Sequence, residues 1–422
     1  MPDVLPLALP PISAERLTER FLRYVAVDTT ADPGAQDFPS NPNELALAEL
    51  LAAELRGLGL TDASVDGFGY VVATLPGNCP APPVGLIAHL DTAPDAPGAE
   101  IRPLLHRDYR GQALVLPGAP ELELSPATCP ALADAVGEDL ITSDGTTLLG
   151  ADDKAGIAVI MSVLDALASQ PAWPHGDLRI VFTPDEEIGS GTRHLDPARL
   201  GLQFAYTVDG GAAPEFNEET FEAANATVRV AGRNVHPGKA KGILINAVEV
   251  LGDLIALLPK DLTPQATSDR QGFIHATSIA GGVEQARLDL ILRDFEPAGL
   301  ARLENVLSEL VDAVRERHPG AGVELEIRPA YPNMKAYLAC DPRVSAFALE
   351  ALAEAGLEPR IVPIRGGTDG AMLSRAGVLT PNLFTGSGNH HSRLEWASIQ
   401  QMAKATEVVL RLVRRWAASG VG

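Results

Sequence analysis

The chain has 422 residues, and 46% of them are hydrophobic, which is enough to bury the cores of two domains. Its 55 acidic residues outnumber its 33 basic residues, and the net charge of −22 argues against binding to nucleic acid or to anionic membrane surfaces. No apolar stretch is long enough to span a membrane, and Met1 to Ile12 lacks the basic start of a signal peptide. Because the three cysteines also form no motif, we expect a cytoplasmic protein.

Strand and helix patterns alternate from the first predicted helix, Glu44 to Leu55, to about Phe216. The apolar run that begins at Val84 is typical of a strand buried on both faces, and it ends in His89-Leu90-Asp91. Because side chains alternate along a strand, His89 and Asp91 point the same way. This spacing fits a metal-ligating imidazole whose second ring nitrogen is held by a carboxylate.

Three further segments of this region bring carboxylates to the ends of apolar elements. Asp152 and Asp153 precede an apolar helix from about Ala155 to Ala168, and Asp153 is equally suited to capping that helix. The strand Leu178 to Phe182 leads to Glu186 and Glu187, and the strand Phe204 to Val208 leads to Asp209. A metal-bound water needs a ligand to hold the metal and a base to take its proton, so of two adjacent glutamates one is suited to bind the metal and the other to act as the base. The alternative is that Glu186 and Glu187 belong to an acidic turn exposed to solvent.

The pattern changes at Phe221. The predicted order is then strand, helix, strand, strand, helix and strand, over Thr227 to Ala231, Asn246 to Leu258, His275 to Ile279, Ala286 to Leu292, Leu300 to Val314 and Val323 to Ile327. This order is typical of a ferredoxin-like domain. We therefore predict an α/β protein in which residues 1–218 and 330–422 form one discontinuous domain and residues 219–329 form an inserted domain.

The α/β pattern resumes after about Pro329. A helix is predicted around Arg343 to Glu354, a Gly-rich segment follows at Arg365 to Gly370, and a long amphipathic helix covers Ser398 to Trp416. Between them, the apolar run Pro381 to Phe384 leads through a Gly-rich loop to His390, His391 and Glu395.

Taken together, these segments supply imidazole and carboxylate groups without a thiolate. That set of donors favours a hydrolytic divalent metal site, with Zn²⁺ as the expected ion and Mn²⁺ or Co²⁺ as substitutes.

Eight segments spread over nearly the whole chain stand out, in the order HLDT, TTLLGADDKAGIA, FTPDEEIG, YTVDGG, NVHPGKAKG, LRDF, PIRGGTDG and NLFTG. Together they resemble the M20 metallopeptidases, and within them the aminotripeptidase branch, peptidase T. The resemblance implies a zinc-exopeptidase-like catalytic domain, made of residues 1–218 and 330–422, with a ferredoxin-like lid inserted into it. It also allows a homodimer, because the lid often joins two copies in related enzymes.

The resemblance also implies a role for each candidate residue. His89, Asp152 and Asp209 would hold one ion, Glu187 and His391 would hold a second, and Asp152 would bridge the pair. Asp91 would orient His89, and Glu186 would be the general base. For the adjacent His390 we expect the edge of the cleft or solvent, because neighbouring side chains in an extended segment point to opposite sides.

Four residues are candidates for contact with the substrate. The resemblance assigns His236 to the polarised carbonyl oxygen and places Asn246 facing the substrate, although a solvent-facing loop histidine and a plain helix cap are the ordinary alternatives. Arg293 and Arg365 are suited to hold the free carboxylate of a tripeptide from each side of a cleft, because a guanidinium donates two parallel hydrogen bonds to a carboxylate. Either could also be an ordinary surface base.

The implied activity is release of the N-terminal residue from small peptides, above all tripeptides, by attack of a water that bridges two metal ions. The nearer alternative is another M20-type hydrolase, namely a dipeptidase, a carboxypeptidase or an N-acyl-amino-acid deacylase. The more distant one is a non-catalytic metal or peptide binder, which an acidic Glu186 disfavours. The segment Gly386 to Trp396 departs from the family pattern, which leaves the preferred side chains of the substrate open.

Overall fold

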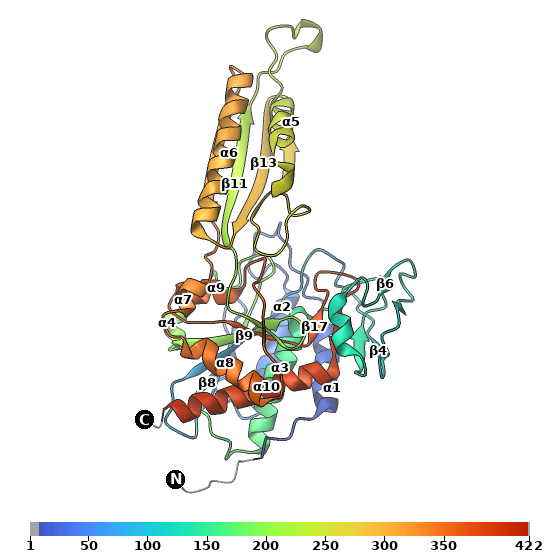
Figure 1. Ribbon diagram of the computed structural model, residues 1–422, viewed down its shortest axis with the longest axis vertical. Coiled ribbons are helices and arrows are strands. Elements are labelled where there is room, and N and C mark those ends of the chain that lie inside the picture. The colour runs from blue at the N-terminus through green and yellow to red at the C-terminus, as the bar shows by residue number, and fades with distance from the viewer. Residues whose placement is uncertain (1–7, 421–422) are drawn as a thin grey trace. The chain divides into compact units, whose positions relative to one another are not determined.

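The computed structural model describes residues 8–420, and the chain divides into two compact units (Figure 1). Unit 1 comprises the chain up to Glu218 together with Met334–Pro363 and the chain from Thr368 onward, and unit 2 comprises Glu219–Asn333 and Ile364–Gly367. The segment Met1 to Leu7, part of the stretch Met1 to Ile12 considered above, lies outside the described residues.

Unit 2 is larger than the predicted inserted domain of residues 219–329. Backbone hydrogen bonds explain the difference: the Phe221 N–H donates to the Gly366 carbonyl oxygen, and the Ala223 N–H donates to the Tyr331 carbonyl oxygen. These bonds attach residues 330–333 and 364–367 to unit 2, so Arg365 belongs to unit 2 and not to the discontinuous domain where the sequence pattern had put it.

Unit 1 is built on an eight-stranded sheet whose central strands are parallel. The pairs β3–β8, β3–β9 and β9–β16 are parallel, whereas β2–β8 and β10–β16 are antiparallel. The four central strands therefore end at the same edge, where open α/β sheets bind their ligands. In sheet order the strands are β1 (Ser64–Val65), β2 (Val71–Leu75), β8 (Leu178–Thr183), β3 (Val84–His89), β9 (Phe204–Gly210), β16 (Asn382–Phe384), β10 (Glu215–Asn217) and β15 (Arg360–Ile361).

Helices cover both faces of this sheet (Figure 1). On one face, the long apolar helix α3 packs on β3 and β9 and contacts α1 and α10, which is why nearly all of its side chains are buried. On the other face, apolar side chains of α4 and α9 pack against Ile87 and Val181 of the sheet. The helices of unit 1 are α1 (Ala14–Val25), α2 (Asn43–Gly57), α3 (Ala151–Ser169), α4 (Pro197–Leu200), α7 (Lys335–Leu338), α8 (Arg343–Glu354), α9 (Asp369–Arg375) and α10 (Ile399–Ser419).

Two small sheets of unit 1 were not predicted from the sequence. Their strands have two or three residues, too few to show a period, and they enclose a cluster around the buried Trp396 and Tyr109. One sheet has the order β17 (Ser387–Gly388), β18 (Trp396–Ser398), β7 (Leu140–Thr142) and β4 (Leu104–His106), and the other pairs β5 (Leu114–Val115) with β6 (Glu123–Leu124), beside the 3₁₀ helix η1 (Pro130–Ala135).

Unit 2 has the predicted βαββαβ order. Its elements are β11 (Glu222–Ala231), the 3₁₀ helix η2 (Pro237–Lys239), α5 (Ala247–Leu257), the 3₁₀ helix η3 (Lys260–Leu262), β12 (Phe273–Gly281), β13 (Gln285–Asp294), α6 (Pro297–Arg317) and β14 (Gly322–Pro329). The antiparallel sheet has the order β12-β13-β11-β14, and α5 and α6 pack on one face, where Val228 and Leu290 are buried. The mixed α/β architecture with an inserted ferredoxin-like domain is therefore confirmed.

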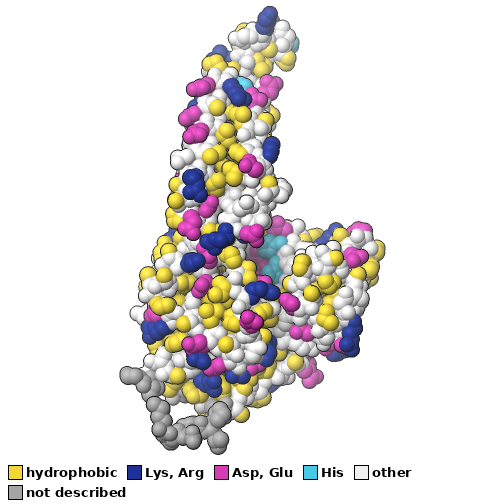
Figure 2. All heavy atoms as spheres, in the orientation of Figure 1, with side chains coloured by type: hydrophobic (Ala, Val, Ile, Leu, Met, Phe, Trp, Pro, Cys, Tyr) yellow, Lys and Arg dark blue, Asp and Glu magenta, His cyan; other side chains and the backbone are white. Residues whose placement is uncertain are grey.

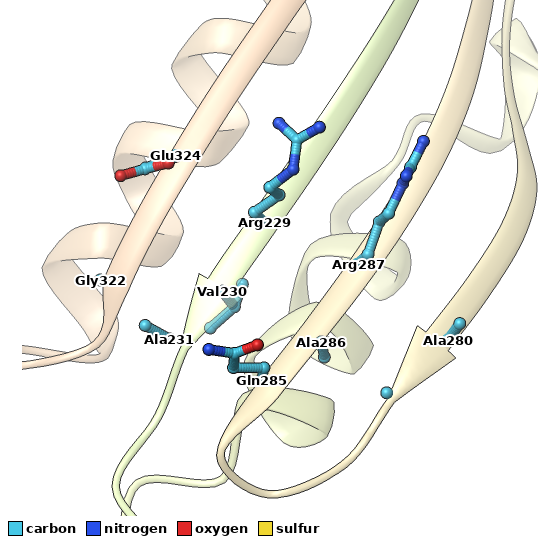
Figure 3. A pocket seen from close by; sticks show the side chains of 10 residues that line it. Arg229, Val230, Ala231, Ala280, Gln285, Ala286, Arg287, Gly322 and Glu324 are labelled. Atoms are coloured by element: carbon cyan, nitrogen blue, oxygen red, sulfur yellow. The ribbon is translucent and has the colours of Figure 1, made fainter.

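The other face of the unit 2 sheet carries charged side chains. An open hollow of about 590 Å³ lies there, and Figure 3 shows Arg229 and Arg287 on its neighbouring strands. Both arginines are already paired, Arg229 with Glu326 at 3.0 Å and Arg287 with Asp289 at 2.8 Å. Acidic and basic side chains are interspersed over the face drawn in Figure 2.

No helix in residues 8–420 is long and apolar enough to cross a membrane.

Candidate metal centre

The carboxyl ends of the central strands bring the predicted ligands of unit 1 together. His89 is the last residue of β3, Asp209 lies near the end of β9, and Asp152 lies at the start of α3. The backbone of α3 departs from helical geometry at Asp152 and Asp153, so both side chains stand before its regular turns. His89 Nε2 is 2.9 Å from Asp152 Oδ1 and 3.5 Å from Asp209 Oδ1.

A second group of ligand atoms lies on the other side of Asp152. His391 Nε2 is 2.9 Å from Glu187 Oε2 and 3.4 Å from Asp152 Oδ2. The two oxygens of Asp152 therefore face two different imidazoles, His89 and His391. Ligand atoms of His89, Asp152 and Glu187 lie within 4.8 Å of one another, which is compact enough for a metal ion.

Asp153 also lies within metal-binding distance of His89 and Asp209. Its oxygens, however, already accept backbone hydrogen bonds: Oδ2 from the His89 N–H at 3.2 Å and Oδ1 from the Gly156 N–H at 3.2 Å. The second of these is the helix cap that the sequence suggested. Asp152, which faces both imidazoles, is therefore the better placed bridging ligand.

Asp91 connects the two halves of the centre. It is fully buried, and its oxygens accept the backbone N–H groups of Glu186 at 2.9 Å and Glu187 at 3.0 Å. The same residue faces His89 Nδ1, with Oδ1 at 3.3 Å and the backbone carbonyl oxygen at 3.1 Å. One carboxylate thus contacts the imidazole of a candidate ligand and fixes the backbone that presents both glutamates.

The electrostatics of the centre reflect an excess of buried negative charge. Burial raises the pKa of Glu186 well above its usual value, and Asp209, Asp369 and Glu187 raise it further. Burial, with Asp152 adding to it, raises the pKa of Glu187 to about 7. Carboxyl groups that resist ionisation in this way are typical of sites that need a cation.

The pKa values of the two imidazoles are raised as well, which favours their charged form. Burial by itself lowers the pKa of His89, but hydrogen bonds to Asp152, Asp209 and Asp91 outweigh it and raise the pKa well above its usual value. Hydrogen bonds to Asp152 and Glu187 raise the pKa of His391 to about 11. In the protein without metal, protonated imidazoles therefore supply the positive charge that metal ions would bring.

The histidine pair differs from the expectation that His390 lies at the cleft edge or in solvent. His390 Nδ1 is 3.3 Å from Asp152 Oδ2, and its Nε2 is 2.8 Å from Ser387 Oγ. The side chain of His390 is 23% exposed, less than the 44% of His391. The segment is not extended, because Asn389 and His391 have positive φ angles of 58°, so the alternation rule for strands does not apply there.

Two residues position the centre in roles that were not predicted from the sequence, although Glu395 was noted there beside the two histidines. Glu395 is buried, and its carboxylate accepts the N–H groups of Leu149, Gly150 and Asp152 at 2.7 to 2.9 Å, which fixes the turn that carries Asp152. The Asp369 N–H, at the start of α9, donates to Glu186 Oε1 at 3.2 Å. The sequence signal for Asp369 is the Thr-Asp step after two glycines, where Thr368 caps the helix.

The four predicted substrate residues lie in unit 2, and two of them have local capping contacts. His236 caps η2, with Nδ1 accepting the Gly238 N–H at 3.1 Å, and it is exposed. Asn246 caps α5, with Oδ1 accepting the Val248 N–H at 3.1 Å.

The two arginines have different surroundings within unit 2. Arg293 Nη1 donates to the Ala224 carbonyl oxygen at 2.9 Å, and its guanidinium lies over the Tyr331 ring. Arg365 Nη1 donates to the carbonyl oxygens of Asp269 and Gln271, and its Nη2 donates to Thr267 Oγ1. Arg293 and Arg365 both belong to unit 2, so the two guanidinium groups come from one unit rather than from two.

Comparison with known proteins shows which family the chain belongs to. Residues 143–415 match the model of peptidase family M20/M25/M40. The chain is 44% identical over 405 residues to a peptidase T from Vibrio atlanticus, covering 96% of this chain and 98% of that protein.

Two solved structures share the fold over 96% of this chain and 99% of theirs. They are the aminopeptidase PepT from Bacillus cereus, with a TM-score of 0.73 and 23% identity, and a tripeptidase from Staphylococcus aureus, with a TM-score of 0.76 and 22% identity. On its sequence, the chain belongs to the M20/M25/M40 peptidase family, in the peptidase T branch.

Proposed function

We propose that the protein is a two-metal aminopeptidase that releases the N-terminal residue from tripeptides. The observation that carries this proposal is the position of Asp152 between two imidazoles, 2.9 Å from His89 Nε2 and 3.4 Å from His391 Nε2. A carboxylate in that position suits a bridge between two metal ions. The tripeptide substrate is supported by the 44% identity to a protein named peptidase T.

The residues of the centre fit such ions. His89, Asp152 and Asp209 would hold one ion, and Glu187 and His391, with Asp152, would hold the other. Glu187 Oε1 is buried and has no hydrogen-bond partner among the described residues, so a cation would supply its missing partner. Imidazole and carboxylate donors suit Zn²⁺, with Mn²⁺ or Co²⁺ as substitutes. When bound, two such ions lower the pKa of a water and stabilise negative charge on the carbonyl oxygen.

The protein's own groups would move the proton. Glu186 would take a proton from the attacking water and return it to the leaving amine. Asp91 would keep this base in register with His89, because it binds the Glu186 N–H and faces the imidazole.

The unit 2 residues would bind the substrate. His236 would polarise the carbonyl oxygen, and Arg293 would bind the C-terminal carboxylate of the tripeptide. Arg293 is favoured over Arg365, because both Nη1 and Nη2 of Arg365 donate to residues 267–271, whereas among the described residues Arg293 donates through Nη1. For Asn246, the cap of α5 favours the structural alternative.

A hydrolysis panel with the purified, metal-loaded protein tests this proposal. The panel contains tripeptides, dipeptides, tetrapeptides, N-blocked tripeptides and acyl amino acids, and the Glu186→Gln protein prepared in parallel controls for contaminating peptidases. We expect release of the N-terminal residue from tripeptides at the highest kcat/KM. Preferred cleavage of dipeptides or of N-blocked substrates would instead identify one of the alternative M20-type hydrolases.

The cytoplasmic location is also part of the proposal. It is supported by Cys79, Cys129 and Cys340, which are all free cysteines in the structure. A homodimer is testable by sedimentation of the purified protein.

A further inference from the structure

Each of the two predicted histidine ligands has an aspartate behind it. His89 directs Nε2 towards Asp152 and Nδ1 towards Asp91, with 3.3 Å between Nδ1 and Asp91 Oδ1. His391 directs Nε2 towards Glu187 and Asp152, and its Nδ1 is 3.3 Å from Asp95 Oδ2. Asp91 and Asp95 both come from the segment that follows β3.

We propose that Asp95 is the positioning residue of His391, as Asp91 is of His89. Asp95 accepts the Nδ1–H of the ring, which fixes the tautomer that leaves the Nε2 lone pair for a metal ion. A carboxylate in this position also makes the imidazole more basic and restricts its rotation. This inference rests on the proposed function, because the role of His391 as a ligand belongs to that proposal.

His391 has more need of such a partner than His89 does. His89 is on a buried strand, and its side chain is only 3% exposed, so packing holds the ring. The His391 side chain is 44% exposed, and the residue lies in a loop rather than in a helix or strand. Packing therefore restricts its ring less than it restricts the ring of His89. The contact of Nδ1 with Asp95 therefore adds to the contacts of Nε2 in orienting the ring.

The backbone around Asp95 is well suited to present a carboxylate at a fixed place. On one side, the Thr92 N–H donates to the Thr29 carbonyl oxygen at 3.1 Å, and on the other, the Pro97 carbonyl oxygen accepts the Leu148 N–H at 2.9 Å. The neighbouring Ala93 and Ala96 are buried. The Asp95 side chain itself is 62% exposed, so its interaction with His391 is weaker than that of the fully buried Asp91.

The test is a metal titration of the purified apo-protein with Zn²⁺ in competition with a chelator, repeated with Co²⁺ to record its absorption spectrum. The wild-type protein should bind two equivalents, and His391→Ala identifies the site that depends on His391. We expect Asp95→Ala to weaken that site alone, by about 10-fold and at most about 100-fold, and to change the Co²⁺ spectrum. Asp95→Asn keeps an acceptor oxygen without the charge, so it should lie between Asp95→Ala and the wild type.

Glu100→Gln is the matched control, because it removes one exposed negative charge five residues along the same segment and should leave both affinities unchanged. In the His391→Ala background, Asp95→Ala should have no further effect on metal binding. The apo-proteins should unfold at the same temperature, since Asp95 is exposed.

Two other results have distinct meanings. If Asp95→Ala keeps both metal affinities and raises only the KM of peptides with a free amino group, Asp95 binds the substrate's ammonium group and the inference is overturned. If the wild-type protein itself binds fewer than two ions, the proposed function fails before the inference is reached.

Discussion

The exchange of Glu186 for glutamine separates the two adjacent glutamates by role. Glutamine has the same shape, and its amide oxygen still accepts the Asp369 N–H that Glu186 Oε1 accepts at 3.2 Å, so the local structure should persist. We expect both metal ions to remain and kcat to fall by about 10² to 10⁴, or more, which is the usual loss when a general base is removed. This corresponds to about 2.7 to 5.4 kcal/mol at about 1.36 kcal/mol per factor of ten.

Glu186→Gln should lower activity but should not lower the stability of the metal-free protein. Burial raises the pKa of Glu186, so in the metal-free protein its contribution to stability is lost as the pH rises through the folded-state pKa. A neutral glutamine has no such loss. Metal-free Glu186→Gln should therefore be at least as stable as the wild type, with the advantage growing as the pH rises. Thermal unfolding at several pH values measures this difference.

The assay combines tripeptide hydrolysis at saturating substrate with metal counting on the same preparation. Glu187→Gln is the matched control, because it changes the neighbouring carboxylate and should lose about one equivalent of metal together with most activity. If Glu186→Gln keeps two ions and more than about a tenth of the activity, Glu186 is not the base. If it loses an ion, the roles of the two glutamates are exchanged.

Three further predictions follow from single side chains. His391→Ala should lose about one equivalent of metal and nearly all activity. His390→Ala should keep two equivalents and lower metal affinity or activity by about 10- to 100-fold, because His390 contacts Asp152; loss of an ion from His390→Ala alone would exchange the two histidines. If Arg293 binds the carboxylate, tripeptide amides should be poorer substrates than the free acids. Arg293→Ala should remove most of this difference and lower kcat/KM for the free acids by tens to hundreds of fold, or about 2 to 3 kcal/mol. Equal rates for amide and acid would reject the contact. Burial raises the pKa of Glu44 to about 9, so the contribution of Glu44 to stability falls as the pH rises from about 4.5 to about 9. Glu44→Gln should therefore flatten the dependence of the unfolding temperature on pH over this window. If the variant keeps the dependence of the wild type, other groups cause it.

The elements that could be predicted from the sequence are those with a clear period. The strand around Val228 alternates buried and exposed residues, and the helix Arg343–Glu354 agrees with its predicted bounds, because burial on one face sets the pattern in both cases. The ligand candidates could be located for the same reason. Each candidate ligand follows a strand or precedes a helix, and the apolar pattern of that strand or helix shows where the element ends and the polar residues begin.

The features that were missed depend on local backbone geometry or on distant contacts. The path of residues 386–395 follows from positive φ angles at Asn389 and His391, which no period announces. Arg365 was assigned to the wrong unit because the Gly366 carbonyl oxygen pairs with Phe221, far away in sequence. The hydrogen bonds of Glu395 to the turn before α3 likewise join residues about 245 positions apart.

The place of β16 in the large sheet has a consequence for synthesis of the protein. β16 lies between β9 and β10 and pairs with both, although it comes more than 160 residues later in the chain. A nascent chain that has emerged only as far as β10 therefore has a gap in its sheet and lacks His391. Because domains tend to fold from the N-terminus as the chain is made, the cleavage centre is completed only when translation is almost finished. A growing polypeptide of this kind carries no working peptidase, and neither does a fragment that ends before β16.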